Sequence, residues 1–173
     1  MEKADLRAEK IDVTLDNSID ITTSAYAAKA MALFKEGYNC SQSVFGAFCE
    51  ELGVDFDTAV KLASGFGGGI GRMREVCGAF SGLVMAASLI YGYDDPKATT
   101  EKIALYEKIR SMADRFREEN GSIICKELLG LQAAEKSAVP EARTSEYYQK
   151  RPCAELCRYA ADLLDEFIRN NPV

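Results

Sequence analysis

The chain has no histidine, and this absence removes several kinds of reactive site. Without an imidazole it cannot use Ser-His-Asp or Cys-His catalysis, ligate haem or zinc through histidine, or attach haem at a Cys-x-x-Cys-His motif. Six cysteines are present over the 173 residues, none of them in a Cys-x-x-Cys pair. The reactive chemistry that the composition leaves open is therefore chemistry of sulfur.

Positive charge and long apolar runs are also scarce. The formal net charge is -6, and an acidic surface argues against nucleic acid, whose affinity for proteins comes largely from neutralised phosphates. The longest apolar stretch, residues 76–93, is interrupted by glycines and serines, so a buried core helix is expected rather than a membrane span. Residues 1–20 are charged and do not resemble a signal peptide. We therefore expect a protein of the reducing cytoplasm that binds neither nucleic acid nor membrane. Cysteines there are metal-binding, catalytic or buried more often than permanently paired.

The spacing of apolar residues predicts an all-α, single-domain, bundle-like fold. Residues 1–20 read as a polar N-terminal arm with a weak strand-like alternation over residues 10–15, and residues 21–173 as the helical domain. Glycines follow four of the predicted helices as end signals, and a loop is expected over residues 132–150. The predicted helices, seven in all, cover residues 27–35, 40–52, 57–62, 77–91, 99–119, 122–129 and 152–169.

Four of the six cysteines fall in the first turn of a predicted helix. Backbone N–H groups are unpaired in a first turn, and the helix dipole there favours negative charge, which stabilises a thiolate. A thiolate is both a nucleophile and a metal ligand, so these cysteines are the candidate reactive residues. In the sequence Asn39 precedes Cys40, the glycine-rich segment precedes Cys77, Ser122 lies three residues before Cys125, and Pro152 precedes Cys153.

The remaining cysteines, Cys49 and Cys157, lie inside predicted helices. Core packing is the simplest interpretation, because free cysteine is among the most buried residue types. Cys157 is four residues after Cys153, on the same helix face. That spacing leaves open a further ligand or a resolving thiol.

Residues 65–71 contain five glycines and form a loop rather than a helix. The loop lacks the Gly-Lys-Ser/Thr of a P-loop, and it lacks the later glycine of a dinucleotide fingerprint. Two interpretations remain: an anion or cofactor site, or close packing of the backbone around a cysteine cluster. The cofactor-site candidates are Gly67, Gly68, Gly69, Gly71 and Arg72, and Arg72, Arg74 and Lys126 lie beside cysteines as candidate cations.

Several segments together resemble the C_GCAxxG_C_C family of small prokaryotic proteins, which are described as redox-active. The segments are residues 37–42, 63–73, 75–82 and 121–130, followed by Cys153, and the resemblance covers about residues 27–167. The four cysteines that name the family correspond to Cys40, Cys77, Cys125 and Cys153. The central motif reads Cys77-Gly78-Ala79-x-x-Gly82, with cysteine and glycine in the reverse order from the family label. The resemblance implies a cysteine-based redox role.

Three functions stay open at this point. The first is thiol–disulfide exchange or electron transfer, with Cys40 and Cys77 as the preferred pair, Cys125 and Cys153 as resolving or relaying thiols, and an unidentified redox partner. The second is a zinc or iron–sulfur site on the same four cysteines. The third is a non-catalytic helical module in which the cysteines only pack. The small residues of 77–91 and the polar arm also suggest a homodimer.

Overall fold

The computed structural model describes residues 24–133 and 135–172, so the polar arm and the alternation over residues 10–15 lie outside the described residues. Within these ranges the chain forms eight α-helices and one short 3₁₀ helix, with no strand. The all-α prediction is confirmed. The helices are α1 (Ala25–Glu36), α2 (Cys40–Phe48), α3 (Phe56–Ala63), η1 (Ser64–Phe66), α4 (Gly78–Tyr91), α5 (Thr99–Asn120), α6 (Cys125–Leu128), α7 (Ser145–Lys150) and α8 (Cys153–Asn170).

Two elements differ from the expectation. The helix expected over residues 40–52 ends at Phe48, so Cys49 is its C-cap rather than an interior residue. The loop expected over residues 132–150 contains α7, which begins where the Thr144 hydroxyl accepts a hydrogen bond of 3.2 Å from the Tyr147 backbone N–H. Its sequence has no long apolar period, so only the local cap signals it.

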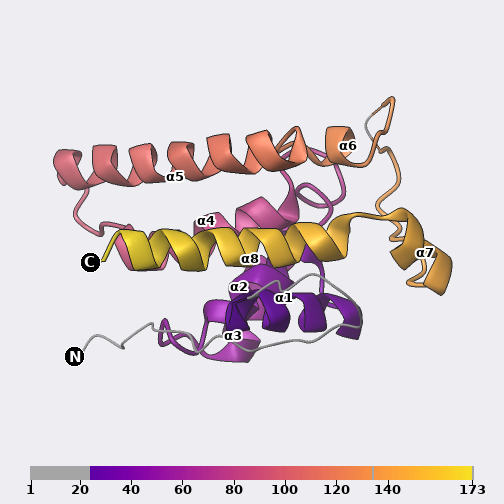
Figure 1. Ribbon diagram of the computed structural model, residues 1–173, viewed down its shortest axis with the longest axis horizontal. Coiled ribbons are helices and arrows are strands. Elements are labelled where there is room, and N and C mark those ends of the chain that lie inside the picture. Colours follow the sequence, from indigo (N-terminus) through magenta and orange to yellow (C-terminus); the bar gives the residue numbers. More distant parts are fainter. Residues whose placement is uncertain (1–23, 134, 173) are drawn as a thin grey trace, which may run out of the picture.

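Helix α8 is the centre of the fold. It contacts α1, α2, α4 and α5, and Figure 1 shows α5 along one side of it and α1 to α3 on the other. Its buried residues recur at three- and four-residue steps, which is the pattern of a helix with one face in the core. The largest fully buried side chains of the chain include Phe34, Phe45, Phe48, Phe116, Leu83, Met112 and Leu164.

Glycines of α4 allow α2 to pack very closely against it. A Cβ added at Gly82 would lie 2.7 Å from the carbonyl oxygen of Ser41 and 2.9 Å from the Cβ of Val44. A Cβ at Gly78 would lie 3.0 Å from the Cβ of Cys40. The small-residue face therefore serves a contact within the chain and brings Cys40 towards the start of α4. This removes one of the two grounds for expecting a homodimer.

Replacing Gly82 by alanine should destabilise the protein by roughly 1–3 kcal/mol, because the added methyl group meets the α2 backbone and overpacks the contact. The free energy of unfolding from urea titration measures this. Gly65→Ala is the matched control, since a Cβ there would meet nothing within 4 Å. Equal urea midpoints for the two variants would show that α2 and α4 can move apart to accept the methyl group without loss of stability.

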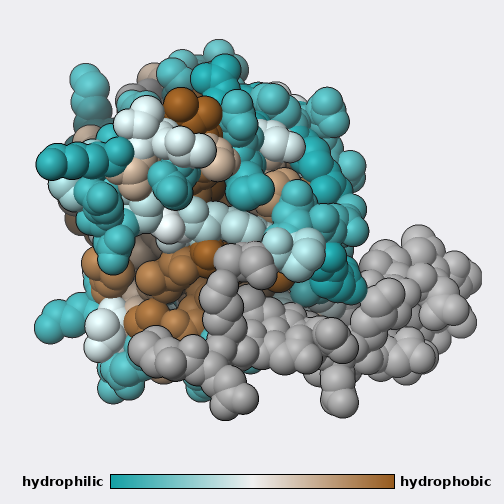
Figure 2. Space-filling model, turned by 90° about the vertical axis from the view of Figure 1, so that its left-hand side faces the viewer, coloured by the Kyte–Doolittle hydropathy of each residue, from teal (hydrophilic) through white to brown (hydrophobic). Residues whose placement is uncertain are grey.

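In the part of the chain that the structure describes, no helix combines the length and apolar content needed to cross a membrane. On the side of the molecule where α8 ends, many residues are hydrophilic, and hydrophobic ones gather in the lower left of the view (Figure 2). The large apolar side chains that are exposed include Leu62, Leu89, Ile103 and Tyr106.

Candidate functional site

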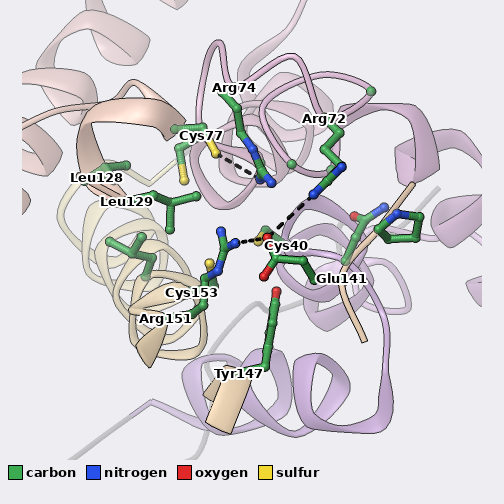
Figure 3. A pocket seen from close by; sticks show the side chains of 18 of the residues that line it. Cys40, Arg72, Arg74, Cys77, Leu128, Leu129, Glu141, Tyr147, Arg151 and Cys153 are labelled. Carbon is green, nitrogen blue, oxygen red and sulfur yellow. Dashed lines mark hydrogen bonds and ion pairs between the residues drawn. The ribbon is translucent and has the colours of Figure 1, made fainter. Parts of the chain in front are cut away.

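The four first-turn cysteines line one cavity of about 300 Å³ (Figure 3). Cys40, Cys125 and Cys153 are the first residues of α2, α6 and α8, and Cys77 is the N-cap of α4. Four helices thus begin at the same cavity. The predicted first-turn setting is confirmed for Cys40, Cys125 and Cys153, whereas Cys77 lies one residue before its helix. The fold brings together residues that are up to 113 positions apart in the chain.

The position of Cys40 follows from the capping of α2. The side chain of Asn39 accepts a hydrogen bond of 3.0 Å from the Gln42 N–H, and the Gln42 side chain accepts one of 3.0 Å from the Asn39 N–H. This reciprocal pair is a capping box, which fixes where a helix starts. Asn39 also donates 2.9 Å to the carbonyl of Ser64, so the start of α2 is tied to the beginning of the glycine loop.

Main-chain pairing brings Cys77 and Cys125 to neighbouring positions. Val76 and Ile124 form an isolated antiparallel bridge. The Cys77 N–H donates 2.8 Å to the carbonyl of Ile123, and the Cys125 N–H donates 2.6 Å to that of Glu75. Ser122, expected as the N-cap of the Cys125 helix, instead precedes the cap, which is Ile124.

The thiol of Cys40 interacts with two cysteines of α8. The Cys157 thiol donates 3.7 Å to the Cys40 carbonyl, and the thiols of Cys153 and Cys157 lie near enough to that of Cys40 to shift its pKa. Cys77 also raises the pKa of Cys40 through its charge. Cys153 therefore joins the expected Cys77 as a candidate partner of Cys40.

Cys49 and Cys157, which are not among the four family cysteines, differ in their position relative to the cavity. Cys157 is fully buried yet touches Cys40, so it packs in the core and also adjoins the site. Cys49 is fully buried, donates 3.2 Å to the carbonyl of Gly46 and does not line the cavity. Core packing describes Cys49 completely.

The expectation of low thiol pKa values in the first turns is wrong. Burial raises the pKa of Cys77 from 9.0 to about 12, although the backbone N–H groups of Phe80 and Ala79 lower it. The interaction with Cys153 lowers the pKa of Cys40. The interaction with Cys157 and burial raise it by more, so that the pKa of Cys40 lies well above 9.0. Loss of solvation outweighs the helix N-terminus because the sulfurs lie inside the molecule rather than at its surface.

Arginines reduce this burial effect at the other two cysteines. The pKa of Cys125 is raised by burial and lowered by the hydrogen bond and charge of Arg74. The pKa of Cys153 is raised by its hydrogen bond to Cys40 and by burial, and lowered by Arg151 and Arg143. The cysteines are thus thiols at neutral pH, beside guanidinium groups that favour the thiolate.

Some residues of the glycine loop line the cavity, and others pack closely against the neighbouring chain. Gly67, Gly68, Gly71 and Arg72 line the cavity, whereas Gly69 is buried with no room for a Cβ, which would lie 2.7 Å from that of Cys125. The N–H groups of residues 70–75 all donate to carbonyls within residues 65–70. Of the glycines expected to form an anion nest, Gly71 therefore uses its N–H within the loop, and arginine side chains also bring positive charge to the cavity.

Sequence reasoning missed the residues that the 132–151 segment adds to the cavity. Arg143, Tyr147 and Arg151 line it, together with Glu141. The sequence does place these three residues close together before Pro152, but their contribution to a cavity depends on tertiary contacts that the sequence does not show. Lys126, expected as a cation near the cysteines, is exposed and does not line the cavity.

Arg72 fastens this segment to the glycine loop. It forms ion pairs of 3.2 Å with Glu135 and 3.5 Å with Glu141, and it donates 2.7 Å to the carbonyl of Ser137. The carboxylate of Glu141 lies between Arg72 and Arg151 and pairs with both (Figure 3). Arg72 therefore holds residues 135–141 at the edge of the cavity.

Replacing Arg72 by alanine should loosen this segment. The loss of charged hydrogen bonds is expected to cost about 1.5–3 kcal/mol locally, which corresponds to faster amide hydrogen exchange over residues 135–150 by about tenfold or more. Exchange followed by mass spectrometry measures this. Arg117→Ala removes an exposed pair with Asp114 on α5 and is the control. Unchanged exchange in Arg72→Ala would show that other contacts hold the segment.

Among the described residues, no group of three or more Cys, Asp and Glu side chains lies in an arrangement that can hold a metal ion. The four cavity cysteines line one space, and the zinc or iron–sulfur interpretation stays a prediction for them.

Comparison with known proteins agrees with the position of these cysteines. The family model described as "Putative redox-active protein (C_GCAxxG_C_C)" matches residues 38–167, which include every cavity cysteine. The chain belongs to the C_GCAxxG_C_C family. A protein of Archaeoglobus fulgidus, described as "Uncharacterized protein", is 28% identical over 142 residues, covering 78% of this chain and 87% of that protein. No solved structure matches the chain.

Proposed function

We propose that this C_GCAxxG_C_C family member carries out thiol–disulfide exchange in the cavity, with Cys40 as the attacking thiol and Cys153 as the resolving thiol. The observation that carries the proposal is that Cys40 and Cys153, the first residues of α2 and α8, meet in one cavity lined by all four family cysteines, near enough for each thiol to shift the pKa of the other. Cys40 is partly exposed while Cys77, Cys125 and Cys153 are buried, which favours Cys40 as the cysteine that a substrate meets.

The exchange proceeds in two steps. The Cys40 thiolate attacks one sulfur of a substrate disulfide, forming a mixed disulfide and releasing one substrate thiolate, which takes up a proton. The Cys153 thiolate then attacks the Cys40 sulfur, forming the Cys40–Cys153 disulfide and releasing the second substrate thiol. Two electrons pass from the cysteine pair to the substrate, and the cysteine protons go to the released thiols.

Groups around the pair have supporting roles. The Cys153 thiol donates to Cys40 and so favours the Cys40 thiolate, while Arg143 and Arg151 favour the later thiolate of Cys153. Cys77 and Cys125, which follow the two residues of the Val76–Ile124 bridge, supply a second dithiol that can pass electrons from an unidentified reducing partner to the Cys40–Cys153 disulfide. A reducing cytoplasm suits this cycle because it returns such pairs to the thiol form. A homodimer and a single helical domain over residues 21–173 stay predictions.

The metal interpretation stays a separate prediction for the same four cysteines. Protein purified without oxygen would contain zinc or iron in stoichiometric amount, and an iron–sulfur cluster would absorb visible light. A metal-free, colourless and stably folded protein would contradict this alternative and leave thiol exchange standing.

Thiol accounting tests the proposed exchange. Fully reduced protein is mixed without oxygen with one equivalent of bis(2-hydroxyethyl) disulfide, and free thiols are counted after unfolding. We expect the loss of two protein thiols and the release of two equivalents of mercaptoethanol per chain. If all six thiols persist while the protein is folded, the cysteines only pack, and the non-catalytic interpretation holds.

A further inference from the structure

The cavity carries positive charge although the protein is acidic overall. Its charged lining consists of four arginines and a single glutamate, with no lysine or aspartate, while the formal net charge of the chain is -6. The lining arginines are Arg72, Arg74, Arg143 and Arg151. A concave site lined by one sign of charge concentrates ligands of the opposite sign.

Arg74 is the most unusual of the four. It is 94% buried, since 6% of its surface is exposed, and it forms no ion pair among the described residues, although Glu135 lies near enough for the charge of Arg74 to lower its pKa. Its Nη1 donates 3.9 Å to the Cys125 sulfur, and its Nε is buried without a hydrogen-bond partner. Figure 3 shows the side chain extending from the glycine loop into the cavity. A buried guanidinium without a carboxylate is costly unless a ligand supplies the missing charge.

Arg143 provides a second positive charge in the cavity lining. It donates 3.1 Å to the carbonyl of Phe34 and 3.1 Å to that of Tyr38, and its guanidinium lies 4.2 Å from the Phe34 ring centroid. These contacts hold the side chain in place without neutralising it, and in the described chain no carboxylate pairs with it. Arg72 and Arg151, in contrast, share Glu141.

Apolar side chains occupy much of the remaining wall. Leu128, Leu129 and Leu156 line the cavity together with Ala138 and Pro140. Fixed positive groups combined with apolar walls suit a short ligand with a carbon–sulfur middle and anionic ends. Arginine in particular binds a carboxylate or sulfonate through paired hydrogen bonds.

We propose that the cavity selects a small organic disulfide with carboxylate or sulfonate ends, which Arg74 and Arg143 bind while Cys40 attacks the central sulfur. This inference rests on the proposed exchange and names its substrate class. The redox balance is unchanged: the disulfide is reduced to two anionic thiols, and the Cys40 and Cys153 thiols are oxidised to one disulfide.

A charge series of disulfides tests the selectivity. Reduced protein reacts under single-turnover conditions with dithiodiglycolate, bis(2-hydroxyethyl) disulfide or cystamine, which carry negative, no and positive charge on arms of similar length. Each rate is divided by that of mercaptoethanol with the same disulfide, which removes intrinsic reactivity. We expect the anionic compound to be favoured by about tenfold or more, and the preference to fall with added salt. Equal normalised rates would overturn the inference while leaving thiol exchange intact.

Binding of adipate gives a readout independent of redox chemistry. Adipate replaces the two sulfurs of dithiodiglycolate by methylenes, and 1,6-hexanediol is its neutral counterpart. Calorimetric titration should detect binding of adipate and not of hexanediol. If adipate binds but no disulfide reacts, the anion site stands and the exchange proposal fails. If neither adipate binds nor the anionic disulfide is preferred, the anion site fails.

Arginine variants locate the binding groups. Arg74→Gln and Arg143→Gln should each reduce the preference for dithiodiglycolate over the neutral disulfide by about tenfold, and Arg117→Gln, on exposed α5, should not change it. Arg143 lies in a half-exposed position, so Arg143→Gln decides the result if Arg74→Gln does not fold. An unchanged preference in Arg143→Gln would overturn the assignment.

Discussion

Replacing Cys40 by serine should abolish reduction of a small disulfide by the reduced protein, and replacing Cys153 by serine should stop the reaction at the mixed disulfide. A hydroxyl group is not a nucleophile at neutral pH without a base, so the Cys40→Ser rate should fall by about a hundredfold or more. In Cys153→Ser the Cys40 thiolate can still attack, but the proposed resolving thiol is no longer present. Intact-mass measurement should then find one substrate half attached to the chain.

Cys49→Ala is the matched control, because Cys49 is buried away from the cavity. Its exchange rate should equal that of the unmodified protein. Full activity in Cys40→Ser would transfer the attacking role to another cysteine, with Cys157, which touches Cys40, as the first candidate. Two-step exchange at normal rate in Cys153→Ser would contradict its assignment as the resolving thiol.

Alkylation of Cys77 by iodoacetamide should be very slow at neutral pH and should rise with pH beyond the range of an ordinary cysteine. Burial raises its pKa from 9.0 to about 12, so at pH 7 its thiolate is about a thousandfold scarcer than that of a free cysteine. The rate should increase about tenfold for each pH unit and should still be rising above pH 9. Mass spectrometry of the peptide containing Cys77 measures this rate.

The same pKa shift affects stability with a defined sign. The folded protein holds the Cys77 proton more tightly than the unfolded chain, so its contribution is complete below about pH 9 and is lost as pH rises towards about 12. In urea-unfolded protein the alkylation rate should level off near pH 9. A folded-state rate that levels off below pH 9 would restore the low-pKa thiolate expected from the first-turn position.

Local signals made most of the fold and the shared setting of the cysteines predictable. Asn39 and Pro152 start α2 and α8 through contacts with the next few residues, and such contacts are visible in a sequence. The glycines of α4 also indicated close packing before their partner was known. The position of Cys40, Cys125 and Cys153 in first turns followed from these local features.

The chemistry of the site depended on distant residues and could not be read in the same way. The pKa of Cys77 is set by burial, which depends on the whole fold and outweighs the local N–H groups that suggested a thiolate. Cys153 and Cys157 lie near the Cys40 thiol because α8 packs against α2. Arg143 joins the cavity through contacts with Phe34 and Tyr38, more than a hundred residues earlier in the chain.

The most direct test is to identify which cysteines become joined when the reduced protein reacts with one equivalent of a small disulfide. Peptide mapping under acidic, alkylating conditions preserves the linkages that form. The account predicts a Cys40–Cys153 disulfide within one chain as the first product, with Cys49 still a free thiol. Intact folded protein in which no two of Cys40, Cys77, Cys125 and Cys153 become linked would contradict the account.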